Sequence, residues 1–148
     1  MGLLSNQPLE RTPLKQTLGI VGASQSRSQE PQLDIYHIWC NLKPGVGDME
    51  FAECVRGYLE RLKQDSQLRA YRITRCKLGF RPPQLREFHI TLEFDDLAQM
   101  QVAFDAVSSR TDPVESLHHA VNSKAQDVVF ALYRDFPDAT RVHGQEKF

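Results

Sequence analysis

The chain has 148 residues, 41% of them hydrophobic, with a formal net charge of −1 and a mean hydropathy of −0.45. A chain of this length forms one domain and buries a sizeable core. Its near-neutral charge gives no overall attraction to nucleic acid or to an anionic membrane surface, and no apolar run is long enough to span a bilayer. Three widely separated cysteines without a C-x-x-C pair, Cys40, Cys54 and Cys76, indicate reduced thiols in a cytoplasmic protein.

The chain divides by composition into a polar start and a denser remainder. Residues 1–33 are rich in Gln, Ser, Gly and Pro, with scattered leucines that follow neither a helical nor a strand period. We interpret them as a flexible tail; a partner-binding arm is the alternative, although no motif supports it. The folded domain is expected over residues 34–138, followed by a short tail over 139–148.

The first predicted element is a strand over residues 34–42, where β-branched and aromatic residues are concentrated. Alternation sends its side chains to two faces. One face carries Tyr36, Ile38, Cys40 and Leu42, and the other carries Ile35, His37, Trp39 and Asn41. The second face is a mixed polar and aromatic set, which a purely structural strand does not require.

A turn over residues 43–47 precedes the clearest helix, for which Asp48 is the expected N-cap. Its buried stripe follows the helical spacing i, i+3, i+4, i+7 and comprises Phe51, Cys54, Val55, Tyr58, Leu59 and Leu62. The preceding Gly-Val-Gly does not indicate a phosphate loop, because it lacks a third glycine and is followed by Asp48 and Glu50.

Two further strands are predicted, over residues 68–80 and 87–94. The later strand alternates cleanly. One face carries Phe88, Ile90, Leu92 and Phe94, and the other carries Glu87, His89, Thr91 and Glu93. The four apolar residues must be covered by helices.

The last third of the chain predicts two helices and a strand. Asp95 and Asp96 cap a helix with an apolar side formed by Leu97, Met100, Phe104 and Val107. Residues 112–115 start a short helix with Val114, Leu117, His118 and Val121 on one side. Residues 127–136 extend that helix or form a strand; we prefer the strand because β-branched and aromatic residues cluster there.

The predicted class is therefore α+β, with the ferredoxin-like order β-α-β-β-α-(α)-β, a four-stranded antiparallel or mixed sheet and helices on one face. We expect the first and third strands to be central, adjacent and parallel. Their alternation then brings His37, Trp39 and Asn41 next to His89, Thr91 and Glu93, on the face away from the helices. Something must cover or use that open face.

Four segments give the chain a family resemblance. They are Tyr-His-Ile-Trp-Cys-Asn-Leu-Lys-Pro-Gly (36–45), Lys-Leu-Gly-Phe (77–80), Glu-Phe-His-Ile (87–90) and Leu-Tyr-Arg-Asp-Phe-Pro (132–137). Through them, residues 34–138 resemble a bacterial domain-of-unknown-function family within the dimeric α/β-barrel superfamily. That resemblance implies a homodimer whose two sheets pack face to face. The superfamily includes cofactor-free monooxygenases, haem-degrading oxygenases, lactone isomerases and stress-responsive proteins, and fold alone does not choose among them.

His37 and His89 are the candidate catalytic residues, since imidazoles that share one space form an acid/base couple near neutral pH. The alternative is that they hydrogen-bond across the dimer and only shape it. Adding Glu93 would give a two-His-one-carboxylate metal set, but the spacing does not demand one, and we predict no metal and no organic cofactor.

The other candidate ligand-binding residues fall into several groups. Trp39, Tyr36, Tyr71 and Tyr133 are candidates for an aromatic pocket, Asn41, Thr91 and Glu93 for its polar wall, Arg75 for an anion contact and His118 for a second pocket under the helices. An RNA-recognition module has the same strand order, but Glu87 follows Arg86 where such a module has glycine, and glutamates line the open face.

The sequence thus predicts a homodimer that binds a small aromatic or carboxylated molecule in a polar-aromatic cavity, without nucleic-acid or membrane partners. Cofactor-free oxygenase or isomerase chemistry is the enzymatic hypothesis. The alternative is a non-catalytic ligand-binding or stress-response homodimer in which the same residues are interface packing.

Overall fold

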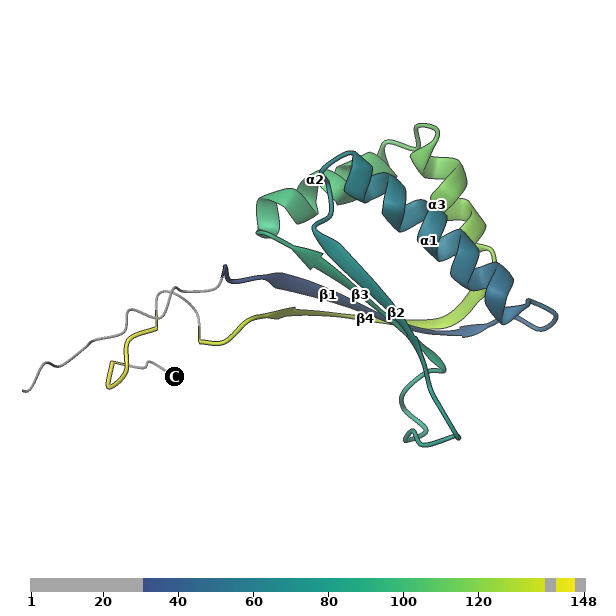
Figure 1. Ribbon diagram of the computed structural model, residues 1–148, viewed down its shortest axis with the longest axis horizontal. Helices are drawn as coiled ribbons and strands as arrows, with labels where there is room; N and C mark the ends of the chain where they lie inside the picture. The colour runs from purple at the N-terminus through teal and green to yellow at the C-terminus, as the bar shows by residue number, and fades with distance from the viewer. Residues whose placement is uncertain (1–30, 138–140, 146–148) are drawn as a thin grey trace, which may run out of the picture.

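The computed structural model describes residues 31–137 and 141–145. The elements in chain order are β1 (Asp34–Leu42), α1 (Asp48–Gln64), β2 (Ala70–Arg75), β3 (Phe88–Phe94), α2 (Leu97–Ser108), α3 (Val114–Asn122) and β4 (Ala125–Arg134). All three helices lie on one face of the four-stranded sheet (Figure 1). The predicted ferredoxin-like α+β fold is confirmed, while most of the two expected tails lies outside the described residues.

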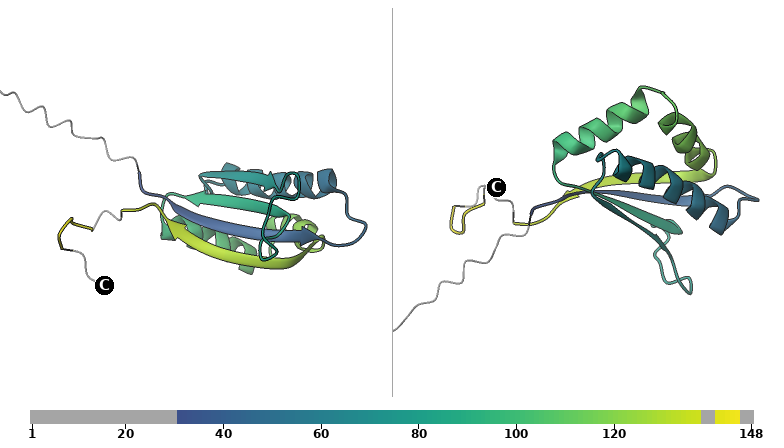
Figure 2. Two further views of the ribbon diagram at one scale, coloured as in Figure 1. Left: turned by 90° about the horizontal axis from the view of Figure 1, so that it is seen from below. Right: turned by 45° about the horizontal axis from the view of Figure 1, so that its top comes forward.

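The sheet has the order β2-β3-β1-β4, and its strands lie side by side when viewed from the face away from the helices (Figure 2). The expectation that β1 and β3 run parallel is wrong: they pair antiparallel, with His37 opposite Thr91 and Trp39 opposite His89. The reason is that the β1-α1-β2 crossover returns β2 in the direction of β1, and the following β2–β3 hairpin reverses it. Adjacency and side-chain parity are unaffected by this correction.

Helix α1 covers one half of the sheet and carries most of the core. Its Phe51, Val55, Leu59 and Leu62 are buried, as the helical spacing predicts. They pack against the four apolar residues of β3, Phe88, Ile90, Leu92 and Phe94. The N-cap of α1 is Gly47 and not the predicted Asp48. Asp48 is instead the first residue of the helix, and its carboxylate accepts a 2.7 Å hydrogen bond from the Met49 backbone N–H.

Strand β2 is shorter than the predicted 68–80 segment. Its last rung is the 2.8 Å bond from the Cys76 N–H to the Glu87 carbonyl, after which a long loop leaves the sheet (Figure 1). Leu78 and Gly79 have left-handed backbones, with φ of 54° and 68°, which do not continue a strand. Pro82 and Pro83 then supply no N–H to a ladder.

Strand β4 confirms the preference for a strand in the 127–136 region, although it begins earlier, at Ala125. Helix α2 is capped by Asp96, whose carboxylate accepts a 2.8 Å bond from the Gln99 N–H. Of the residues in α2, only Ala103 is buried; the predicted apolar residues Leu97 and Phe104 remain 45% and 37% exposed. The α2 half of the molecule is therefore much less tightly packed than the α1 half.

The helix-facing side chains of β4 are likewise incompletely covered, because Val128, Phe130 and Leu132 are all exposed.

At the start of β1, the buried carboxylate of Asp34 accepts bonds of 2.7 and 3.0 Å from the Arg134 guanidinium, which joins β1 to the end of β4. Within the described residues, no helix is long and apolar enough to cross a membrane.

Candidate functional site

Four aromatic rings form a cluster on the open face of the sheet: His37 and Trp39 from β1, His89 from β3 and Tyr133 from β4. The Nδ1 of His37 lies 2.9 Å from the Nε2 of His89. Trp39 stacks on His89 at 4.6 Å between ring centroids and 3° between planes, and the Tyr133 ring meets His37 edge-on at 4.9 Å. The period of two in β1 and β3 produces this open-face cluster, as the sequence predicts.

The hydrogen bond between the two imidazoles needs one donor nitrogen and one acceptor nitrogen. Burial lowers the pKa of His37, and burial together with the neighbouring His37 lowers the pKa of His89. Both shifts favour a neutral pair at pH 7, held in one orientation by the Trp39 ring. Such a pair can pass a proton between its members, and it can equally serve as a packed structural contact.

Among the polar residues around the cluster, the Asn41 side chain is bonded to the sheet, whereas the Thr91 hydroxyl and the Glu93 carboxylate have no hydrogen-bond partner among the described residues. The Asn41 side chain accepts a 3.0 Å bond from the Glu87 N–H and donates a 3.0 Å bond to the Asp127 carboxylate, which braces β1 against both neighbours. Thr91 lies opposite His37, and Glu93 lies opposite Ile35. Within the described residues, no three His, Cys, Asp or Glu side chains are grouped closely enough to hold a metal, so Glu93 does not complete a ligand set with the histidines.

A cavity of about 500 Å³ lies on the other side of the sheet, between the strands and the helices. Its wall is mainly apolar and includes Ile38, Phe104, Val107, Val121, Val128 and Phe130. It exists because α2 does not close onto β4, so that the apolar side chains of both elements face a space rather than each other. The sequence places the expected cavity on the open face; this one lies on the opposite face.

Polar groups are concentrated at Tyr36, Tyr58, Ser108, His118 and Asn122 in the wall of this cavity. The Tyr36 ring packs between Phe104 and Phe130, at 5.3 and 5.7 Å. Tyr58 lies 5.4 Å from the His118 ring. Among the described residues, neither tyrosine hydroxyl has a hydrogen-bond partner, so both are available to a bound molecule.

Burial and the nearby Tyr36 raise the pKa of Tyr58 to about 12. Burial also lowers the pKa of His118, an effect that the Glu115 carboxylate partly opposes. At neutral pH the cavity therefore presents uncharged phenols and an uncharged imidazole. This is a set of neutral hydrogen-bond donors, with one imidazole nitrogen able to accept a proton.

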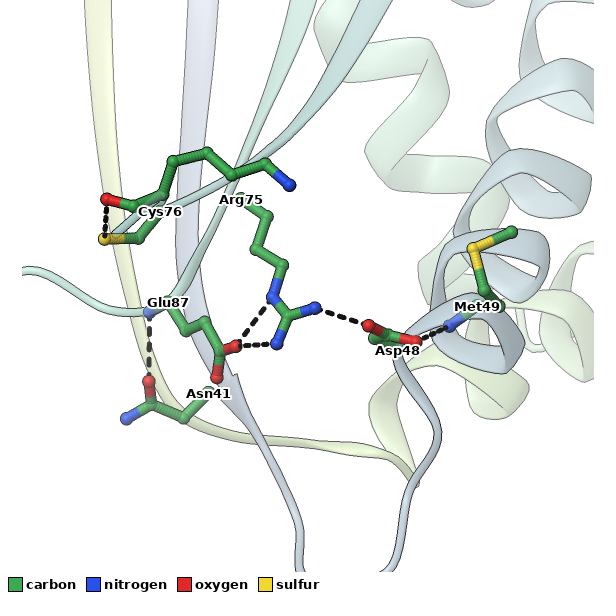
Figure 3. Close-up of polar contacts among 7 residues, drawn as sticks. Asn41, Asp48, Met49, Arg75, Cys76 and Glu87 are labelled. Carbon is green, nitrogen blue, oxygen red and sulfur yellow. Dashed lines mark hydrogen bonds and ion pairs between the residues drawn. The ribbon is translucent and has the colours of Figure 1, made fainter. Parts of the chain in front are cut away.

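Two predicted ligand residues lie elsewhere. The Tyr71 hydroxyl donates a 2.7 Å bond to Glu60 of α1, on the helix side of the sheet. Arg75 forms ion pairs with Glu87 and with Asp48 at the start of α1, as Figure 3 shows, so its guanidinium joins β2 to α1 and to the β3 edge. His118, in contrast, lies where the helical spacing predicts, facing the space under the helices.

Sequence reasoning did not single out Tyr58, Ser108 or Asn122. Tyr58 occurs within the apolar stripe of α1, where an aromatic residue is indistinguishable from core. Asn122 follows His118 by four residues on α3, and its amide nitrogen lies 3.1 Å from the His118 Nε2. That i, i+4 pair of polar residues on an otherwise apolar helix face is the signal that could have identified the site.

Residues 33–148 match the model of DUF6614, a family of unknown function. The chain belongs to this family. No curated protein matches the chain.

Solved structures share the fold at very low sequence identity. SnoaB, a cofactor-independent oxygenase from Streptomyces nogalater, is 6% identical, with a TM-score of 0.55 over 76% of this chain and 100% of its own. Hydroxynitrile lyase from Passiflora edulis is 9% identical, with a TM-score of 0.55 over 74% and 98%. A dimeric ferredoxin-like protein of unknown function from Thermobifida fusca is 11% identical, with a TM-score of 0.50 over 70% and 92%. At these identities the likeness establishes the fold alone.

Proposed function

We propose that this member of DUF6614 binds a small, largely apolar organic molecule in the cavity between its sheet and its helices. The observation that carries the proposal is the cavity itself: about 500 Å³, apolar in most of its wall, with a few polar side chains directed at one region. Ligand sites commonly have volumes of roughly 300–1,000 Å³ and this same division between apolar wall and sparse polar groups.

The polar groups support a ligand that carries an acceptor oxygen, such as a carbonyl. Tyr36 and Tyr58 are neutral donors whose hydroxyls have no partner among the described residues, and His118 adds an imidazole beside them. A ligand oxygen that accepts from these groups would satisfy donors that are otherwise held in an apolar space. The aromatic rings of Phe104 and Phe130 favour a flat body next to that oxygen.

The open face supports a homodimer, in which two sheets would pack against each other. Tyr133 of the open-face cluster and Val129, on the same face of β4, are 59% and 42% exposed in the single chain. A sheet with helices on one side only leaves its other face to be covered, and the Thermobifida fusca protein of the same fold is described as dimeric. In this proposal His37 and His89 are interface residues, and three free cysteines fit the expected cytoplasmic location.

An enzymatic function is the second candidate, favoured by one observation. A neutral imidazole, that of His118, lies beside a phenol in the wall of an apolar cavity, which is an arrangement suited to proton abstraction next to a carbonyl. The oxygenase and the lyase that share this fold are 6% and 9% identical to this chain, so their chemistry does not carry over to it. The His37–His89 pair is the competing acid/base couple, and the two sites are separable by mutation.

The test of ligand binding uses the neutral fluorescent probe N-phenyl-1-naphthylamine with the full-length protein. Ser108→Phe places a ring in the mouth of the cavity, and Val102→Phe adds the same kind of bulk on the exposed side of α2. We expect Ser108→Phe to weaken probe binding at least tenfold and Val102→Phe to leave it unchanged. Equal affinity in both variants and the wild type would show that the probe binds elsewhere and would contradict the proposal.

A further inference from the structure

A second compartment of about 390 Å³ lies next to the main cavity, where the α2–α3 turn meets α3. It is lined by Val107, Ser108, Arg110, Glu115, His118, His119 and Asn122. Four of these residues, Val107, Ser108, His118 and Asn122, also line the main cavity, so the two spaces are neighbours across a shared wall. We call this second compartment the polar annex.

The charged residues of the annex differ in how well the fold accounts for them. Glu115 is in the first turn of α3, where the helix dipole favours a carboxylate. Arg110 has a left-handed backbone with φ of 50°, in a turn where glycine or asparagine is the ordinary choice. Its N–H bonds the Val107 carbonyl, but its guanidinium has no ion-pair or hydrogen-bond partner among the described residues. The fold therefore explains Glu115 and leaves the Arg110 side chain without a structural task.

The main cavity lacks what the annex supplies. None of the side chains that line the main cavity is permanently charged, whereas the annex adds one guanidinium and the second imidazole of the pair His118 and His119. A guanidinium and imidazole N–H groups are all donors, and a guanidinium matches the two oxygens of a carboxylate in a fork. Glu115 opposes them with a single negative charge, so the annex should favour an anion moderately rather than strongly.

We propose that the ligand is amphipathic: its apolar body lies in the main cavity and an acidic head, of the carboxylate class, lies in the annex against Arg110. This inference rests on the proposed function and specifies the class of molecule for the same site. His118 and Asn122, in the shared wall, contact the junction between body and head. The apolar side chains of Val107 and Val121 hold the body next to that junction.

The experiment compares 2-naphthylacetic acid with its methyl ester, by calorimetry on the full chain. The acid should bind the wild type more tightly than the ester. Arg110→Gln should weaken binding of the acid about tenfold, in line with the loss of one charge-assisted contact. Glu115→Gln should strengthen it several-fold, because it removes the opposing charge. Neither change should alter binding of the ester, and Arg56→Gln, on the exposed surface of α1, is the matched control.

Opposite signs for the two variants are the decisive result, since a general loss of structure would not produce a gain in Glu115→Gln. Equal affinity for acid and ester, unaffected by either variant, would overturn the acidic head while leaving the cavity proposal intact. If 2-(2-naphthyl)ethylamine binds more tightly than 2-naphthylacetic acid, and Arg110→Gln strengthens its binding further, the annex binds a cation and the inference is overturned. If neither probe binds the wild type, the proposed function fails and this inference fails with it.

Discussion

The two faces of one sheet differ in the partners of their central polar groups. At the centre of the open face, the imidazoles of His37 and His89 bond each other, and the Asn41 side chain bonds the Glu87 N–H and the Asp127 carboxylate. On the helix side, Tyr36 and Tyr58 line the cavity, and their hydroxyls have no hydrogen-bond partner among the described residues. Mutual satisfaction suits a surface that packs against another surface, and unsatisfied donors in an apolar cavity suit a ligand.

The largest expected effect comes from disrupting the open face as the proposed dimer interface. Val129→Glu combined with Tyr133→Glu places two carboxylates on that face, where a symmetric dimer would bring four together. We expect the dimer dissociation constant to rise by at least about 100-fold, because buried unpaired charges are costly. Light scattering over a concentration series measures it.

Leu132→Glu is the matched control for this double variant. Leu132 lies on the same strand and is 47% exposed, but it faces the helix side. We expect it to leave the dimer intact. A dimer that survives the double variant, or that is lost equally in Leu132→Glu, would remove the interface role from the open face.

The second prediction compares the packed and hollow halves of the helix side. Phe51→Ala removes a side chain that is fully buried under α1 and should lower the free energy of unfolding by about 3–5 kcal/mol. Phe104→Ala removes a cavity-lining ring that is 37% exposed and should lower it by about 1 kcal/mol or less. Denaturant unfolding measures both, and similar losses would mean that the cavity is closed by packing in solution.

Sequence alone predicted the open-face cluster because β-strand parity is a local property. Once β1 and β3 are adjacent, a period of two fixes which face His37, Trp39 and His89 occupy, whichever way the strands run. Tyr71 and Arg75, which the sequence offered as ligand residues, instead bond Glu60 and Asp48 of α1 on the helix side, and spacing along the chain does not reveal such contacts. Alternation alone therefore does not decide which face of the sheet binds a ligand.

The cavity could not be predicted from the sequence, and the reason is different. The apolar stripes of α2 and β4, which include Phe104 and Phe130, have the spacing of core residues. Whether two such stripes meet or stand apart depends on the angle and distance at which α2 packs, which is a tertiary property. His118 could be placed under the helices from the sequence, while the empty volume beside it could not.

The third prediction concerns the stability of the fold at acidic pH. The pKa of His37, His89 and His118 is lowered in the folded state, so these groups stay neutral where an unfolded chain would bind protons. Their contribution to stability is full above about pH 6.5, the unfolded value, and is lost as pH falls through the lower folded values. The free energy of unfolding, measured by denaturant titration between pH 8 and 5, should decline in that window.

Variants assign this decline to one face or the other. The double variant His37→Gln, His89→Gln should flatten most of it, since it removes two of the three groups and the bond between them. His118→Gln should flatten it less and leave dimer formation unchanged. If His118→Gln alone abolishes the decline, the open-face pair titrates normally and its neutral, mutually bonded state is refuted.

The smallest expected effect tests single hydroxyls in the cavity. Tyr58→Phe removes a phenol that has no hydrogen-bond partner among the described residues and whose ring packs against His118. The free energy of unfolding should change by no more than about 0.5 kcal/mol, because the ring remains and no protein bond is lost. Affinity for 2-acetylnaphthalene, a flat neutral ketone, should fall several-fold, whereas affinity for 2-ethylnaphthalene, which has no acceptor oxygen, should not change.

Tyr71→Phe is the control for this hydroxyl, because the Tyr71 phenol donates to Glu60 instead of facing the cavity. Its loss should cost stability, on the order of 1 kcal/mol, and leave both affinities unchanged. The two variants should thus have opposite effects: Tyr71→Phe lowers stability without changing affinity, and Tyr58→Phe lowers affinity without changing stability. A Tyr58→Phe protein that loses stability but binds the ketone normally would place the Tyr58 hydroxyl in the first class and leave Tyr36 and His118 to recognise the oxygen.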